Sequence, residues 1–317
     1  MPPATDILNR PMRTEKQIAA ELAGTVSSQT VIRCDEPLAR HTTLRIGGPA
    51  DVYVEPASEA DLAAVLQFCR GHAVRFFVIG RGSNLLVRDG GYRGVILCLA
   101  HANFSRIEIA GERMHCGAGA KLKNVAVEAK RNGLSGLEFL EGIPGSVGGA
   151  LRMNAGAMGG ATFDVVESVR LMGFDGTVRE AAPQEMSVEY RSCADLKTHV
   201  ALGAVFKCRS APREEIEKRM KAFSEKRWAS QPAAPSAGCM FKNPATIPVG
   251  RLIDELGLKG TRVGDAVVSD EHGNFLVNEG RATARDVLEL IATLKAQAKK
   301  ARGIELHTEV EIIGEDR

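Results

Sequence analysis

The sequence predicts an α+β protein with two or three subdomains. Strand-like and helix-like segments follow one another irregularly, a glycine-rich stretch interrupts them at 133–160, and the composition changes near residue 210. The chain has 317 residues, a length that suits about two domains. Its apolar fraction of 44% and its charged fraction of 25% are ordinary for globular proteins.

Helix caps, chain breakers and apolar spacing predict the elements of the first half of the chain. Ser58 is a helix N-cap, and apolar residues at helical spacing run from it to Gly71, which ends the helix. A second helix opens at 117–119 and runs to Gly133 by the same criteria. A weaker helix signal lies at 15–22. Apolar runs bounded by turn residues predict strands at 51–55, 75–79, 94–99 and 106–109.

In the second half, three strands precede three helices, and a last strand follows them. The segment 211–228 is a polar amphipathic helix whose buried face is Ile216, Met220 and Phe223, and we place a domain boundary before it. Pro248 and Thr283 each begin a further helix, at 249–256 and 284–301. The strands of this half are expected at 165–172, 177–181, 200–207 and 305–313.

Charge, hydropathy and cysteine usage limit the partners. The net charge of +2 gives no reason to expect nucleic acid or a membrane surface. No run of about 18 apolar residues and no signal-type N-terminus occurs, so we expect a cytoplasmic protein. The 7 cysteines include no CxxC pair, which suits reduced thiols and predicts no metal site. Nothing indicates a coiled coil, and we expect a monomer.

The stretch 133–160 holds nine glycines in 28 residues, interleaved with apolar side chains. This mixture indicates backbone packed closely against a flat or phosphorylated group, and therefore a cofactor cradle. Known phosphate motifs fail, because Leu85 and Leu122 stand where a dinucleotide fingerprint needs its third glycine, and no GxxxxGK[ST] occurs. Two glycine-bearing turns remain, 80–86 and 143–150, whose backbone N–H groups could form a pyrophosphate nest. The alternative is that these glycines only make tight turns.

Seven blocks of sequence resemble one enzyme family in their order. They are HTTLRIGGPAD (41–51), VIGRGSNLLV (78–87), GIPGSVGGALRMNAGAMGG (142–160), YRSC (190–193), SAGCMFKNP (236–244), LIDELGLKGTRVGDAVVSDEHGNFLVN (252–278) and LHTEVEIIG (306–314). This order is similar to that of the UDP-N-acetylenolpyruvoylglucosamine reductases (UDP-N-acetylmuramate dehydrogenases), which make UDP-N-acetylmuramate for bacterial peptidoglycan. The short distance from YRSC to SAGCMFKNP resembles the type II branch of that family.

The resemblance implies a cofactor and a domain plan. Noncovalent FAD is expected in a two-part domain resembling the vanillyl-alcohol oxidase (PCMH-type) flavin fold, at 35–210 with a break near 100. A C-terminal α+β substrate-binding domain is expected at 211–317, and 1–34 is expected to be an extension. NADPH is the implied hydride source, although no ribose-reading motif separates it from NADH. The expected FAD contacts are Ile79, Gly80, Arg81, Gly82, Ser83, Asn84, Leu85, Gly145, Ser146, Gly149, Ala150, Asn154, Ala155 and Gly156.

The family reaction implies three catalytic residues. Hydride passes from NADPH to the flavin and on to the β-carbon of an enolpyruvyl group, after which an enolate needs charge stabilisation and its α-carbon a proton. Arg191 carries over as the cation that grips the carboxylate, although a Tyr-Arg pair alone could be a surface salt bridge. Cys239 stands where the family usually has a serine proton donor, and the alternative is an inert buried thiol. Glu309 matches the catalytic glutamate, whereas Glu311, on the same expected strand face, is expected to face solvent.

For the UDP-sugar, the resemblance and the chemistry of the side chains favour six positions. Arg227 could equally belong to a solvated helix face, and HGNF (272–275) could simply be a turn. The expected substrate contacts are Tyr190, Arg227, Lys242, Asn243, His272 and Asn274.

Two other functions compete with the reductase. A non-catalytic protein could keep the cradle without the chemistry, but Arg191, Cys239 and Glu309 are all present. A flavin oxidase of the same fold would act on another alcohol or sugar, and the SAGCMFKNP block argues against it. Flavin absorbance and substrate-dependent NADPH oxidation separate the three.

Overall fold

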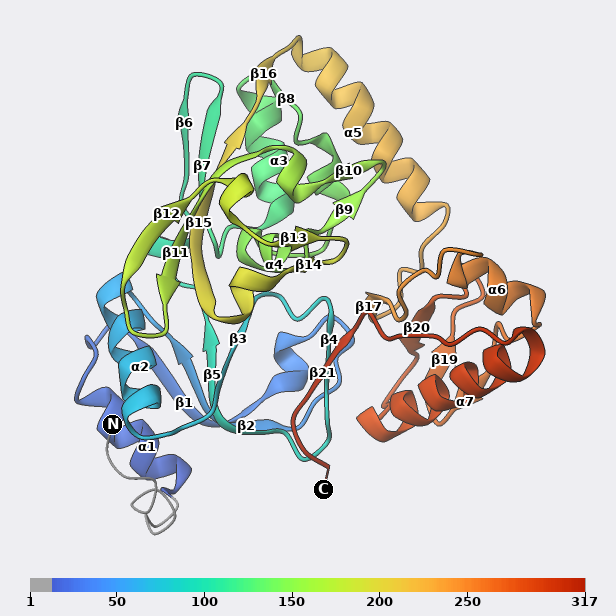
Figure 1. The fold of residues 1–317 in the computed structure, drawn as a ribbon, viewed down its shortest axis with the longest axis horizontal. Helices are drawn as coiled ribbons and strands as arrows, with labels where there is room; N and C mark the ends of the chain where they lie inside the picture. The colour runs from blue at the N-terminus through green and yellow to red at the C-terminus, as the bar shows by residue number, and fades with distance from the viewer. Residues whose placement is uncertain (1–12, 317) are drawn as a thin grey trace.

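The computed structural model describes residues 13–316. Figure 1 shows one block of structure near the N-terminus, a larger one above it, and a third, of helices and short strands, at the C-terminal end. Helix α5 (Arg213–Trp228) connects the second block to the third (Figure 1). No helix within 13–316 is long and apolar enough to cross a membrane, and no group of three or more potential metal ligands occurs there.

The first block is a sheet in which β2, β5 and β3 run parallel and β1 is antiparallel to β2. Alternate residues of the strands face opposite sides, because side chains alternate along a strand. Val52 and Val95 join the main core cluster, whereas Tyr53 and Ile96 join a separate one. Helix α2 (Glu59–Gly71) belongs to the main cluster, and its N-cap Ser58 accepts the Asp61 N–H as predicted. The strands are β1 (Val31–Pro37), β2 (Pro49–Glu55), β3 (Phe76–Ile79) and β5 (Tyr92–Cys98).

The second block is a five-stranded antiparallel sheet of order β12-β11-β15-β7-β6. Helices α3 (Leu122–Arg131) and α4 (Val147–Arg152) bury their apolar residues in the same main core. The strands of the sheet are β6 (Ile107–Ala110), β7 (Arg113–Gly117), β11 (Val166–Gly173), β12 (Val178–Ala181) and β15 (His199–Lys207). Three short antiparallel pairs complete it, β8 (Leu134–Ser135) with β16 (Arg209–Ser210), β9 (Gly156–Ala157) with β10 (Gly160–Ala161), and β13 (Val188–Glu189) with β14 (Ser192–Cys193).

The third block has its own apolar core. Helices α6 (Val249–Glu255) and α7 (Ala284–Arg302) pack on an antiparallel sheet of order β17-β20-β19-β18. Thr283 begins α7 with a capping box, and Gly303 ends it at φ 67°. The strands are β17 (Ser236–Cys239), β18 (Arg262–Val263), β19 (Ala266–Val268) and β20 (Phe275–Asn278).

The chain then returns to the first block. Strand β21 (Glu311–Ile313) pairs in parallel with β4 (Leu85–Val87), and Figure 1 shows the two lying side by side. Leu86 of β4 is fully buried in the core of the third block. This parallel pairing joins residues more than 200 positions apart and fixes the C-terminal segment to the first block.

All six predicted helices are present, with ends within a few residues of the expected ones. Ile216 and Met220 of α5 are buried as predicted, and Phe223 packs against the core while partly exposed. The strands that were not predicted are β1, β4, β7, the short pairs β8–β16, β9–β10 and β13–β14, and the whole sheet of the third block, β17–β20; helix α4 was not predicted either. The prediction of a final strand at 305–313 was too long, since the observed strand β21 covers only Glu311–Ile313. Before it, the chain bonds to the third block, where Lys242 N–H donates to the His307 carbonyl, and only then does it pair with β4.

The described part of the expected extension packs with the first block. Helix α1 (Glu15–Ala23) buries Ile18 and Leu22 in the main core cluster, and residues 31–34 already belong to β1. Residues 1–12 of that expected extension lie outside the described range.

Leu22→Ala tests whether α1 is part of the core. Leu22 is 0% exposed, so we expect the free energy of unfolding to fall by about 2–5 kcal/mol, measured by urea denaturation. The matched change Lys16→Ala, on an exposed position of the same helix, should stay within about 0.5 kcal/mol of wild type. Equal effects of the two changes would show that α1 is only loosely attached.

Candidate active site

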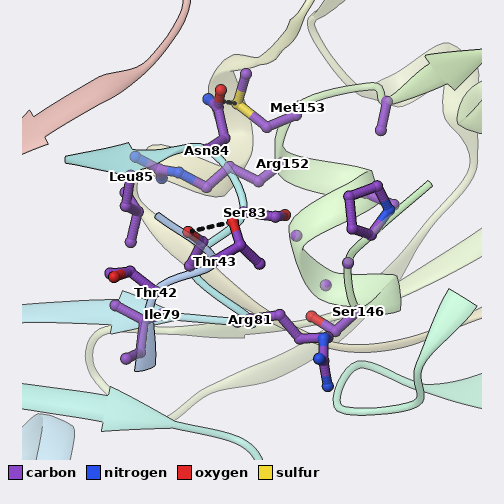
Figure 2. A pocket seen from close by; sticks show the side chains of 18 of the residues that line it. Thr42, Thr43, Ile79, Arg81, Ser83, Asn84, Leu85, Ser146, Arg152 and Met153 are labelled. Atoms are coloured by element: carbon purple, nitrogen blue, oxygen red, sulfur yellow. Dashed lines mark hydrogen bonds between the residues drawn. The ribbon is translucent and has the colours of Figure 1, made fainter. Parts of the chain in front are cut away.

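The main cavity lies where the blocks meet. It has a volume of about 1290 Å³, and its walls include both glycine turns, Arg191 of the β13–β14 turn, the segments 227–228 and 231–239, and the C-terminal segment around Glu309. Figure 2 shows side chains of the first turn, including Ser83 and Asn84, beside Ser146 and Arg152 of the second block.

The first turn connects β3 to β4 and needs its glycines. A Cβ on Gly80 would stand 2.6 Å from the Ser146 Oγ, and one on Gly82, at φ +60°, would stand 2.2 Å from the His41 carbonyl oxygen. The backbone N–H groups of 81–84 donate to no other protein group within the described part of the chain. Consecutive free N–H groups are the donors of an anion-binding nest.

The second turn is held against the loop before α3. Leu122 N–H donates to the Gly145 carbonyl at 3.1 Å, and Val147 N–H donates to the Ala120 carbonyl at 2.9 Å. The buried Ser146 hydroxyl does not cap α4. It faces Gly80 of the first turn, and a Cβ added to Gly149 would stand 3.6 Å from its Oγ. The two turns therefore lie within side-chain contact of each other, which fits a pyrophosphate held between them.

Most of the expected FAD contacts line this cavity. Ala155 and Gly156, in the glycine-rich stretch 133–160, also do so, but Asn154 does not. Its amide is occupied elsewhere, because Nδ2 donates to the Glu189 carbonyl at 3.2 Å and Oδ1 accepts the Phe163 N–H at 3.2 Å. Asn154, at φ +37°, therefore shapes the backbone, and its expected contact with the cofactor is not supported.

Arg191 and Glu309 form an ion pair on the cavity wall. Arg191 Nε donates to Glu309 Oε1 at 2.9 Å, and only 24% and 11% of the two side chains are exposed. Arg191 has φ +57° in the turn between β13 and β14, a conformation that is costly for a non-glycine residue. The turn directs its guanidinium into the cavity, where Nη2 also donates to the Gly156 carbonyl at 3.4 Å.

Glu309 is positioned through its backbone. Its N–H donates to the Met240 carbonyl at 2.9 Å, and its carbonyl accepts from Asn84 Nδ2 at 3.1 Å. Asn84 belongs to the first glycine turn, so its side chain links this turn to the C-terminal segment that carries Glu309. Burial raises the pKa of the Glu309 carboxyl, while the charges of Arg191 and Lys242 lower it.

Cys239 ends β17 directly before Met240 and lines the same cavity. Burial and the charge of Glu309 raise the pKa of its thiol to about 12, with Arg191 opposing the change. The influence of both charges on this sulfur means that the three predicted catalytic residues are neighbours. At neutral pH the thiol is protonated, as a proton donor must be and as a nucleophile must not.

A second ion pair, which the sequence did not predict, lies on the same wall. Arg152 Nη2 donates to Glu311 Oε1 at 2.8 Å, and Nη1 donates to the Leu196 carbonyl at 2.7 Å. The Arg152 guanidinium also lies 5.6 Å from the centre of the Phe77 ring. The expectation that Glu311 simply faces solvent was wrong, because the return of the chain to β4 turns this side chain toward the second block.

The expected substrate residues divide into two groups. Arg227 lines the main cavity, and its Nε is buried without a hydrogen-bond partner among the described residues. Tyr190 is 57% exposed with its ring 5.0 Å from the Arg191 guanidinium carbon, and Lys242 is exposed beside Cys239 in the chain.

The other three lie around a smaller cavity of about 290 Å³ that shares Cys239 with the main one. Asn243 and His272 line it, although the Asn243 Oδ1 already accepts the Val249 N–H at 2.9 Å. Asn274 was expected to contact substrate, but its buried amide bonds the Phe241 backbone on both sides, at 2.9 and 2.8 Å. It therefore holds the chain next to Cys239.

The raised pKa of Cys239 predicts its reactivity. In a Cys34→Ser background, which removes the exposed thiol, alkylation of Cys239 by iodoacetamide should be slow from about pH 7 to about pH 10, as followed by peptide mass spectrometry. Glu309→Gln removes a charge that raises the pKa and should speed alkylation, whereas Arg191→Met should slow it. If the alkylation rate of Cys239, with Glu309 and Arg191 unchanged, had its midpoint at pH ~8.5, the raised pKa of this thiol would be contradicted.

The Arg152–Glu311 pair should stabilise the return of the C-terminal segment. A double-mutant cycle of Arg152→Met and Glu311→Gln should give a coupling free energy of about 0.5–1 kcal/mol in urea denaturation, since both side chains are largely covered. The exposed pair Arg251–Glu255 on α6 is the control and should couple by no more than about 0.5 kcal/mol. If both pairs couple equally, the first has no special role.

Two family models match the chain. One, described as an FAD binding domain, covers residues 50–182, and the other, described as UDP-N-acetylenolpyruvoylglucosamine reductase, C-terminal domain, covers residues 231–313. Together they confirm the predicted fold class, a flavin-binding part followed by an α+β C-terminal domain, and the predicted cofactor, FAD.

Similar proteins agree along nearly the whole chain. The UDP-N-acetylenolpyruvoylglucosamine reductase of Syntrophomonas wolfei is 43% identical over 90% of this chain and 96% of its own, and that of Geobacter metallireducens is 44% identical over 95% and 98%. The crystal structure of the reductase from Thermus caldophilus matches with a TM-score of 0.78 at 38% identity, over 90% of this chain and 99% of that one. The chain therefore belongs to the UDP-N-acetylenolpyruvoylglucosamine reductases, FAD-dependent oxidoreductases of peptidoglycan precursor synthesis.

Proposed function

We propose that the protein uses NADPH to reduce UDP-N-acetyl-3-O-(1-carboxyvinyl)glucosamine to UDP-N-acetylmuramate, with Arg191, Glu309 and Cys239 as its catalytic residues. The observation that carries this proposal is the grouping of a buried arginine–glutamate pair and a protonated thiol in the cavity that the two glycine turns also line. The domain plan, with boundaries near 34 and 210, the type II assignment, a monomeric state and a cytoplasmic location remain predictions beside it.

The two glycine turns would hold FAD, and the bound flavin would supply hydride transfer from NADPH to the β-carbon of the substrate. The free N–H groups of 81–84 and the hydroxyls of Ser83 and Ser146 are the donors available to its diphosphate. No lysine is needed, because backbone dipoles converge on the anion.

Arg191 binds the carboxylate of the enolpyruvyl group and stabilises the charge that develops on it. A guanidinium suits this role because it stays charged and its donors are planar. Glu309 fixes the guanidinium through Nε, which leaves the other donors for substrate. Glu309, paired with Arg191 at 2.9 Å, thereby orients the guanidinium toward the charge that develops on the enolate.

Cys239 delivers the proton to the α-carbon. The S–H bond breaks, its proton and the electron pair of the enolate form the new C–H bond, and the thiolate that remains lies near the Arg191 cation. The high pKa keeps the thiol loaded before the step and makes it quick to recover a proton from solvent afterwards.

The nucleotide end of the substrate would contact Tyr190, Arg227, Lys242, Asn243 and His272. Arg227 is the strongest of these candidates, since its buried Nε lacks a partner among residues 13–316. His272 shares the smaller cavity with Cys239, and the charge of Lys242 acts on Glu309.

Cys239→Ala tests the mechanism by separating its two half-reactions. In a stopped-flow experiment NADPH should still bleach the flavin at a rate near wild type, whereas reoxidation by the enolpyruvyl substrate should slow by about 10²–10⁴-fold, the usual contribution of a general acid. Cys239→Ser should retain more of the second step than the alanine variant. Equal loss in both half-reactions would contradict the assignment, and a colourless purified protein would contradict the proposal as a whole.

A further inference from the structure

The C-terminal end of α5 carries an aromatic surface that the proposed mechanism does not use. Trp228 is the one tryptophan of the sequence, its side chain is 60% exposed, and it lines the main cavity. The Arg227 guanidinium carbon lies 5.6 Å from the centre of its ring. One face of the indole is therefore covered by a cation while much of the ring remains open to a planar ligand.

Arg227 is a partly buried cation whose Nε has no hydrogen-bond partner among the described residues. Its Nε is the one buried side-chain nitrogen or oxygen of residues 13–316 without a hydrogen-bond partner. Its side chain passes Gly142, where an added Cβ would stand 3.8 Å from the Arg227 Cδ. Burial lowers the pKa of Arg227, opposed by the charge of Glu141. An unpaired, partly desolvated guanidinium is costly unless a ligand neutralises it.

The wall of the cavity connects this pair to the catalytic thiol. After Trp228, every residue from 231 to 239 lines the cavity. A ligand bound at the end of α5 can therefore extend along one continuous segment of chain to Cys239. This path suits a long substrate with a nucleotide at one end and its reacting group at the other.

We propose that Arg227 and Trp228 form a nucleoside diphosphate subsite, in which Trp228 stacks on the base and Arg227 binds the diphosphate, and that the occupant is the uridine diphosphate part of the substrate. The inference rests on the proposed function, because the substrate is a UDP-sugar there. NADPH carries the same chemistry and is the second source of a nucleotide. The resident FAD does not require this subsite, since the glycine turns already provide backbone donors for its diphosphate.

The single tryptophan makes the test direct. In the FAD-loaded wild-type protein, saturating UDP should change the tryptophan emission and reduce its quenching by acrylamide by at least about twofold, because a stacked indole is shielded. NADP⁺ is titrated in parallel. Protection by UDP supports the proposal, whereas protection by NADP⁺ without UDP would overturn the choice of occupant.

Matched variants test the two residues separately. Trp228→Ala should raise the KM for the UDP-sugar roughly 10-fold, as expected for loss of one base stack, with kcat much less affected, and Trp228→Phe should recover most of the loss. Arg227→Met should weaken UDP binding by a similar factor. Lys226→Met, which removes an exposed cation one residue away that does not line the cavity, should bind UDP as wild type does.

Failure of this inference can be told from failure of the proposed function. If the wild-type protein oxidises NADPH with the UDP-sugar but UDP leaves the tryptophan unprotected and Trp228→Ala keeps the wild-type KM, the subsite is wrong and the function stands. If UDP protects the tryptophan but no turnover occurs, the subsite stands and the function is wrong.

Discussion

The parallel pairing of β21 with β4 is the constraint on which the active site depends. It brings the last residues of the chain back to the first glycine turn, and Asn84 joins the two by donating to the Glu309 carbonyl while its own carbonyl accepts the Glu311 N–H. The same return places Glu309 against Arg191 and Glu311 against Arg152. Because the first turn is part of the cradle, any displacement of the C-terminal segment would move the cradle and the carboxylate together.

The Arg191–Glu309 pair is better explained by chemistry than by stability. Both side chains are largely covered, and the desolvation of two charges consumes much of what their attraction returns. Arg191 in addition has a positive φ, which stores a further cost in the turn that presents it. A pair that is expensive to bury and held in a strained turn is what a site needs when a charge must be ready before the substrate arrives.

The sequence predicted what local physics determines. Ser58 and Thr283 begin their helices as expected, because a cap is decided within one turn, and Gly82 of the first glycine turn marks a close approach to the His41 backbone that a Cβ would block. It did not predict β4 or the shortness of β21, since a parallel pair between distant segments leaves no local pattern. The amides of Asn154 and Asn274, which were expected to bind ligands, bond protein backbone instead, because an amide in a turn is as suited to bonding nearby backbone as to binding a ligand.

The environment of Cys239 fits the proton-donor role proposed for its thiol. A cysteine beside a cation alone would ionise near neutral pH and lose the proton it has to deliver. Here burial and the Glu309 carboxylate outweigh Arg191 and keep the pKa at about 12, so the thiol remains protonated. The same burial also raises the pKa of Glu309. One poorly solvated wall therefore keeps the thiol protonated, and a serine-to-cysteine exchange in a wetter, more cationic cavity would produce a nucleophile in place of an acid.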